Sequence, residues 1–112
     1  METSAVVTSV EGPVAWIRLN RPDAMNALSP EVTAGLEKAI GQVERDETVR
    51  CAVITGEGRA FSAGGDLKGF RASVEAKAHD SFVANLHHFR GVFRSIEQSR
   101  LPFIAAVNGF AV

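Results

Sequence analysis

Two adjacent glycines followed by an aspartate are the residues of this chain best placed to do chemistry. Gly64, Gly65 and Asp66 lie in the run Ala60–Lys68, just after the apolar stretch Cys51–Thr55. In parallel α/β sheets, ligands collect outside the carboxyl ends of the strands, and paired glycines let the backbone approach a ligand closely. Backbone N–H groups fixed in such a loop can stabilise a developing oxyanion. The residues predict either an oxyanion site or a structural turn in which Asp66 caps the next helix.

A phosphate-binding loop is a weaker interpretation of the neighbouring residues. The run Gly56–Phe61 has the first two glycines of GxGxxG, but Phe61 occupies the third position. Close packing of helix on strand requires Gly or Ala there, and the run follows a later strand rather than the first. No GxxxxGK[ST] pattern occurs. A nucleotide loop is therefore not favoured.

The remaining reactive side chains favour structural roles. His87 and His88 are consecutive and point in different directions on a helix, while His79 precedes it, so we expect solvated or packing roles and no metal site. Cys51 begins a strand, and a buried thiol is generally inert. Phe82, Phe89 and Phe93 recur at helical spacing, and we interpret them as core residues rather than as a ligand pocket.

The elements that position the glycine loop begin with a hairpin and a crossover. Residues 5–19 are rich in Val, Ile and Thr and are interrupted by Glu11-Gly12-Pro13, which predicts two strands joined by a tight turn. Ser29-Pro30-Glu31 then supplies a helix cap, a proline at the first helical position and an acid in the first turn. The apolar stripe of that helix is Val32, Leu36, Ile40 and Val43. With the strand Cys51–Thr55, these elements predict a right-handed crossover with parallel pairing.

A second crossover is predicted to follow. A helix is expected from about Asp80 to Gln98, and then a short strand at Phe103–Val107. Residues 108–112 are interpreted as a turn followed by nothing, which leaves the far side of the last strand open. Residues 56–60 and 69–79 are interpreted as short polar connections. The apolar stripe of the second helix is Phe82, Leu86, Phe89, Phe93 and Ile96.

Composition limits the classes of function. The chain has 112 residues, a net charge of −1 and one cysteine. The charge leaves no cationic excess for a nucleic acid or an anionic membrane, and a single cysteine excludes an intrachain disulfide. No signal peptide or membrane-spanning run is recognisable. We expect an α/β fold in one domain, located in the cytoplasm.

Four blocks of the chain are similar to one family. They are Arg21–Leu28, Ala52–Gly56, Phe61–Leu67 and Pro102–Gly109. All four resemble the enoyl-CoA hydratase/isomerase (crotonase) superfamily in order and spacing. Together they cover nearly the whole chain from about Val14, so the resemblance is specific for the superfamily, although it does not select a subfamily.

The resemblance implies a spiral of repeated ββα turns that binds acyl-coenzyme A thioesters and stabilises an enolate. It implies that Ala63 donates its backbone N–H to the thioester carbonyl, with Gly64, Gly65 and Asp66 shaping the loop. Asp23, Ala24 and Met25 match the family's backbone contacts to the adenine end of CoA. No separate cofactor or metal is implied, because coenzyme A belongs to the substrate. The activities implied are those of a hydratase (lyase) or isomerase in fatty acid metabolism.

The resemblance also implies that residues 1–112 are the N-terminal part of a single, truncated crotonase-like domain. Family members are longer, and their next block supplies a second oxyanion donor and, in hydratases, a catalytic glutamate. We therefore expect the isolated 112-residue chain to be inactive. The leading hypothesis that the resemblance implies is a family member that acts on acyl-CoA thioesters through oxyanion-hole stabilisation of an enolate. The alternative to that hypothesis is a catalytically silent truncated fragment, or a CoA-binding or subunit-interaction module. Homo-oligomers, trimers or hexamers, are implied for full-length members and are doubtful for this chain.

Overall fold

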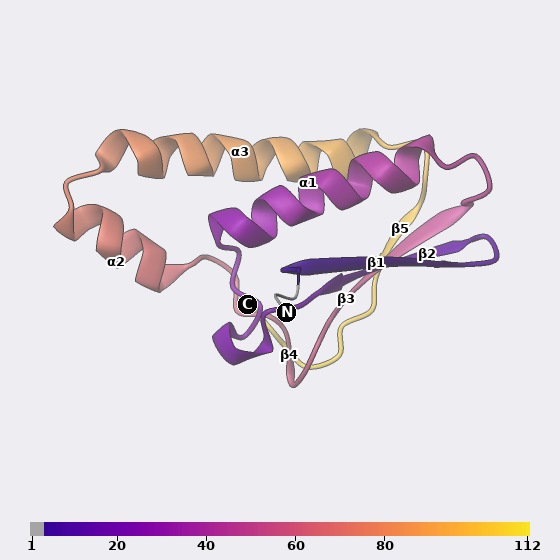
Figure 1. Ribbon diagram of the computed structural model, residues 1–112, viewed down its shortest axis with the longest axis horizontal. Coiled ribbons are helices and arrows are strands. Elements are labelled where there is room, and N and C mark those ends of the chain that lie inside the picture. The colour runs from indigo at the N-terminus through magenta and orange to yellow at the C-terminus, as the bar shows by residue number, and fades with distance from the viewer. Residues whose placement is uncertain (1–3) are drawn as a thin grey trace.

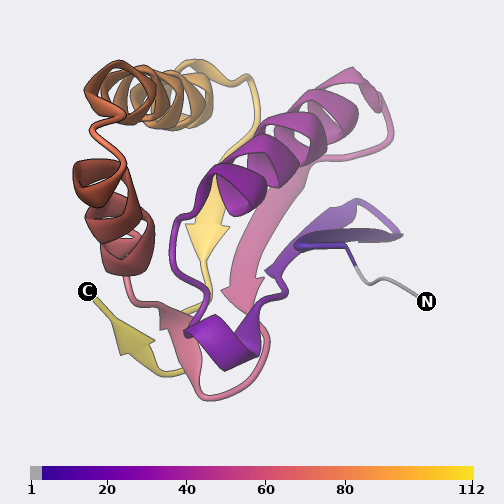
Figure 2. The ribbon, with the colours of Figure 1, turned by 60° about the vertical axis from the view of Figure 1, so that its left-hand side comes forward.

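The protein consists of a mixed four-stranded sheet covered on one side by helices, with a small second sheet beside it. The structure is a computed structural model that describes residues 4–112. The larger sheet contains, in spatial order, β1 (Val6–Glu11), β2 (Val14–Leu19), β3 (Cys51–Gly56) and β5 (Phe103–Ala105). Figures 1 and 2 show α1 (Pro30–Arg45) and α3 (His79–Gln98) on the same side of this sheet.

The hairpin and both parallel connections agree with the sequence prediction. β1 pairs antiparallel with β2, β2 pairs parallel with β3, and β3 pairs parallel with β5. α1 begins where the Ser29-Pro30 signal places it, because the Ser29 hydroxyl accepts a hydrogen bond from the Val32 N–H at 3.2 Å. The four residues of its predicted apolar stripe are all buried.

The core lies between α1 and the larger sheet. Ala15, Ile17 and Leu19 of β2 point into it at every second position, as the period of a strand requires. The buried core residues are Ala5, Ala15, Ile17, Leu19, Val32, Leu36, Ala39, Ile40, Val43, Val49, Ala52, Val92 and Leu101.

The predicted burial of the second helix is wrong in detail. α3 is helical as expected, but its one buried residue is Val92, which is outside the predicted stripe. Leu86 and Phe93, which belong to that stripe, are 48% and 39% exposed. Periodicity identifies the apolar face of a helix, but it does not say which neighbouring element covers that face.

A third helix occupies the segment that the sequence analysis assigned to a polar connection. α2 (Leu67–Glu75) is capped at its N-terminus by Asp66 and ends two residues before Lys77, whose φ is 55°. None of its residues is buried, so it lacks the long apolar stripe by which α1 was recognised. In Figure 1 it projects beyond one end of the sheet.

Two very short strands were also missed. β4 (Ala60–Ser62) and β6 (Phe110–Ala111) pair in parallel and form the second sheet. The last residues are therefore not a turn followed by nothing. The predicted open side of β5 is present, since Ile104 is 52% exposed. No helix within residues 4–112 is long and apolar enough to cross a membrane.

Candidate functional site

The glycine loop follows β4, and its successive backbone N–H groups have different partners. The Ala63 N–H donates to the Met25 carbonyl at 2.9 Å, and the Gly64 N–H donates to the Ser62 hydroxyl at 3.1 Å. Within residues 4–112, the Gly65 N–H makes no hydrogen bond. Gly65 is exposed, and a Cβ built on it would meet nothing within 4 Å. Its N–H is therefore the open donor of the loop.

The predicted donor, Ala63, already has a partner within the protein. The resemblance assigned the donation to Ala63, but the Met25 carbonyl already occupies that N–H. The acceptor lies 38 positions earlier in the chain (63 − 25 = 38). Local sequence contains no signal for such a contact.

The loop is held at its centre by Gly64. Its φ is +82°, a conformation that residues with a Cβ rarely adopt. A Cβ there would also approach the Val112 carbonyl oxygen to 2.7 Å. The Gly64 carbonyl accepts a hydrogen bond from the Leu28 N–H at 2.7 Å, which connects the loop to the start of α1. Gly65 therefore follows a residue whose N–H and carbonyl groups are both held by hydrogen bonds.

The predicted CoA-contacting segment lies beside this loop. Asp23 and Ala24 belong to the 3-10 helix η1 (Pro22–Ala24) and are exposed, whereas Met25 is half-buried. The Met25 carbonyl contacts Ala63 directly, as described above. The structure thus brings this segment and the glycine loop together.

Asn26 anchors both segments and was not singled out by the sequence analysis. Its side chain is fully buried, and its amide group donates to the carbonyls of Glu57 (3.0 Å) and Ala60 (2.9 Å). Its amide oxygen accepts from the Arg21 N–H at 2.8 Å. The Asn26 carbonyl accepts from the Ser62 hydroxyl at 2.8 Å. One side chain therefore ties the residues around η1 to β4.

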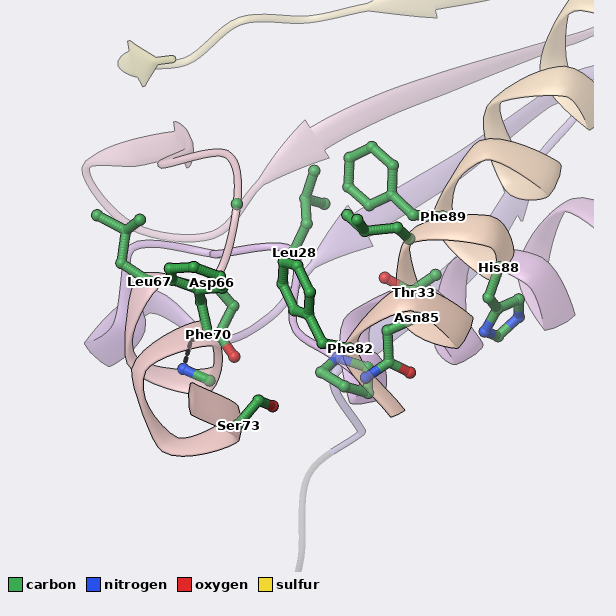
Figure 3. A pocket seen from close by; sticks show the side chains of 14 residues that line it. Leu28, Thr33, Asp66, Leu67, Phe70, Ser73, Phe82, Asn85, His88 and Phe89 are labelled. Atoms are coloured by element: carbon green, nitrogen blue, oxygen red, sulfur yellow. Dashed lines mark hydrogen bonds between the residues drawn. The ribbon is translucent and has the colours of Figure 1, made fainter. Parts of the chain in front are cut away.

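Asp66 has the structural role that the residues alone allowed. Its carboxylate accepts a hydrogen bond from the Gly69 N–H at 3.1 Å, which makes it the N-terminal cap of α2. Figure 3 shows this bond as a dashed line at the edge of a cavity.

The cavity has a volume of about 420 Å³ and lies between the start of α1, α2 and α3. Gly65, Asp66 and Leu67 line it, so the open N–H belongs to a residue on its wall. The other lining residues are mainly apolar, and they are Leu28, Pro30, Thr33, Gly69, Phe70, Ser73, Phe82, Asn85, Leu86, His88 and Phe89. Phe82 and Phe89 were predicted to be core residues, but both lie on the cavity wall.

Two titratable residues line the cavity, and each has a partner. Asp66 caps α2, and His88 Nε2 lies 2.8 Å from Glu37 Oε2 on α1. His79 and His87 are exposed, as expected. Among the lining residues, no carboxylate or imidazole is without a partner of this kind. The described residues therefore provide a donor beside an apolar cavity, but no uncommitted acid or base within it.

The comparison with known proteins gives the same family as the residue blocks. The family model described as enoyl-CoA hydratase/isomerase matches residues 9–112. The 1,2-epoxyphenylacetyl-CoA isomerase of Escherichia coli (strain K12) is 36% identical over 106 residues, which are 95% of this chain and 40% of that protein. The short-chain-enoyl-CoA hydratase of Clostridium acetobutylicum is 36% identical over 115 residues, covering 100% of this chain and 42% of that protein.

Solved structures agree with this result. A crystal structure of an enoyl-CoA hydratase from Polaromonas sp. JS666 matches with a TM-score of 0.86 and 33% identity, over 93% of this chain and 40% of that one. An enoyl-CoA hydratase/isomerase from Mycobacterium paratuberculosis matches with a TM-score of 0.80 and 36% identity, over 96% of this chain and 42% of that one. The chain belongs to the enoyl-CoA hydratase/isomerase family and has the crotonase fold over the part it spans. It spans about 40% of the length of the curated relatives it matches.

Proposed function

We propose that the protein binds acyl-CoA thioesters and that the Gly65 N–H polarises the thioester carbonyl. The observation that carries this proposal is an exposed, unpaired backbone donor on the wall of an apolar cavity. Relatives of similar identity are named as a hydratase and as an isomerase of CoA thioesters. Both kinds of reaction need the negative charge on the thioester oxygen to be stabilised. The proposal therefore concerns this shared step and not the reaction that follows it.

In the proposed complex, the acyl group occupies the cavity and the thioester oxygen accepts from the Gly65 N–H. When the α-proton leaves, negative charge develops on that oxygen, and a donor already fixed in place stabilises it without reorganising. The bonds of Ala63 and Gly64 fix the loop before any ligand binds. Loss of one such donor typically lowers turnover by about a hundredfold to a thousandfold.

The CoA end of the ligand is proposed to lie along Asp23, Ala24 and Met25. Asp23 and Ala24 are exposed, and the Met25 carbonyl contacts the loop that carries Gly65. Contacts there would be made through the backbone. We propose a cytoplasmic protein with no cofactor apart from CoA itself. Trimers or hexamers are proposed for full-length family members and not for this chain.

A second candidate function is thioester binding without turnover by these residues. It is favoured because both titratable groups of the cavity wall are already engaged, Asp66 with Gly69 and His88 with Glu37. General acid–base catalysis needs a group that can reach the substrate proton. The polarised carbonyl is common to both candidate functions.

The test uses an acyl-CoA labelled with ¹³C at the thioester carbonyl. Binding is expected to move the carbonyl resonance downfield, as hydrogen bonding withdraws electron density from carbon. Gly65→Pro removes the N–H and should abolish the shift. Gly65→Ala keeps the N–H and has open space for its Cβ, so it should retain the shift. An unchanged shift in folded Gly65→Pro would overturn the proposal.

A further inference from the structure

Three phenylalanine rings line the cavity. Phe70 comes from α2, while Phe82 and Phe89 come from α3. The ring centroids of Phe70 and Phe82 are 4.7 Å apart, with the planes inclined at 54°. Figure 3 shows these two rings directed toward one another, with Leu28 and Phe89 beside them. The pair connects α3 to α2, a helix with no buried residue.

The core does not account for this aromatic pair. Phe70 is 45% exposed, and α2 buries none of its residues. Phe89 makes a second pair, with Phe93, at a centroid distance of 4.7 Å and an angle of 65°. Phe93 does not line the cavity. The cavity therefore has an aromatic wall on the α2 and α3 side that solvent reaches.

We propose that this wall selects acyl groups that carry an aromatic ring, and that Phe70 and Phe82 are its specificity-determining residues. The inference rests on the proposed function, because it assigns the chemical class of the acyl group in that same cavity. A ligand ring can take a tilted or edge-on position against Phe82, an arrangement that aromatic pairs prefer. A flexible saturated chain gains no such contact.

A second physical effect acts in the same direction. A ring is already rigid, whereas a saturated chain of equal carbon number loses rotational freedom when the cavity orders it. The aromatic contact alone corresponds to about a twofold to tenfold difference in affinity. Both effects favour the aromatic ligand. Burial of apolar surface stabilises both ligands and therefore does not by itself discriminate between them.

The experiment compares the dissociation constants of phenylacetyl-CoA and octanoyl-CoA by titration calorimetry. The two acyl groups have the same number of carbons, so the comparison isolates ring from chain. The unmodified 112-residue protein should bind phenylacetyl-CoA about twofold to tenfold more tightly. Phe82→Leu keeps an apolar side chain without the ring, so the preference for phenylacetyl-CoA over octanoyl-CoA should disappear.

Phe93→Leu is the matched control, since it changes the same residue type on the same helix outside the cavity, and it should keep the preference. Phe70→Leu, at an exposed position, gives a second variant if Phe82→Leu does not fold, and it should also lose the preference. Equal or tighter binding of octanoyl-CoA, or an unchanged preference in a folded Phe82→Leu or Phe70→Leu protein, would overturn the inference while leaving the proposed function standing. Failure of both thioesters to bind would overturn the proposed function and the inference with it.

Discussion

At the scale of single residues, the site depends on which backbone groups are already satisfied. The N–H groups of Ala63 and Gly64 donate within the protein, whereas that of Gly65 has no acceptor among residues 4–112. A buried polar group needs a hydrogen-bond partner within the protein, whereas an exposed N–H is hydrated and remains available to donate to a ligand. The fully buried Asn26 makes this division possible, because its amide satisfies groups from Arg21, Glu57 and Ala60.

Asn26→Ala should therefore be costly for stability. It removes one hydrogen bond from each of three backbone groups; the bond to Ala60 is buried, and those to Arg21 and Glu57 are partly buried. Each unsatisfied buried group costs about 1–3 kcal/mol, and partial rearrangement should bring the total loss to about 2–4 kcal/mol. The free energy of unfolding in urea measures this loss. Gln42→Ala, on the exposed side of α1, should change stability by less than about 0.5 kcal/mol; an equal loss in both variants would contradict the anchoring role.

At the scale of elements, Glu44 joins the end of α1 to the end of α3. Its carboxylate accepts hydrogen bonds from the Ser99 hydroxyl and from the Arg100 N–H, the latter at 3.3 Å. The Ser99 hydroxyl is the main cause that lowers the pKa of Glu44, and Arg100 adds to it. The pKa of nearby Asp46 is also lowered, chiefly by the Thr48 hydroxyl.

A lowered pKa in the folded protein predicts a loss of stability in acid. The contribution of Glu44 should be complete above the ordinary glutamate pKa of about 4.3 and should be lost as the pH falls through the lower folded value. Because Glu44 and Arg100 are partly exposed, the contribution of Glu44 to the free energy of unfolding should stay below about 1 kcal/mol. Unfolding of the unmodified protein and of Glu44→Gln, compared from pH 7 downward, should give a difference that shrinks in acid. Because Asp46 is present in both proteins, its own contribution cancels in this difference. A difference that stays constant with pH would contradict the hydrogen bonding of the Glu44 carboxylate.

The elements also show what sequence can predict. α1 was predictable because Ser29, Pro30 and a four-residue apolar stripe are all local signals. α2 was predicted only through its cap. Asp66 was interpreted as a possible helix cap, but the apolar residues that follow are exposed, so most of the segment was assigned to a polar connection. β4 and β6 were missed because strands of three and two residues have no period to detect. The engagement of the Ala63 N–H could not be predicted either, because its acceptor, the Met25 carbonyl, is distant in the sequence.

At the scale of the whole molecule, one end of the sheet region is apolar and open. Ile104 on β5, and Val107 and Phe110 after it, are all more than half exposed. Exposed apolar surface of this kind promotes association. β5 is an edge strand of the larger sheet, so its unpaired side can also accept another strand.

The protein should therefore associate with rising concentration, and Ile104→Lys should reduce that association, because a charge on an edge strand opposes pairing. Sedimentation velocity over a range of concentrations measures the effect. Val7→Lys introduces a lysine on β1, the strand at the opposite edge of the larger sheet, and should reduce association less. An entirely monomeric protein, or equal effects of the two variants, would contradict this assignment.

The proposed function depends on Gly65, rather than Ala63, donating its N–H to the thioester oxygen. The most direct measurement is the backbone amide spectrum of the ¹⁵N-labelled protein, titrated with an acyl-CoA and separately with free CoA, which lacks the carbonyl. The Gly65 amide proton should move downfield with the thioester only, while the Ala63 amide proton keeps its position because the Met25 carbonyl holds it. A downfield shift at Ala63 with none at Gly65 would contradict the account.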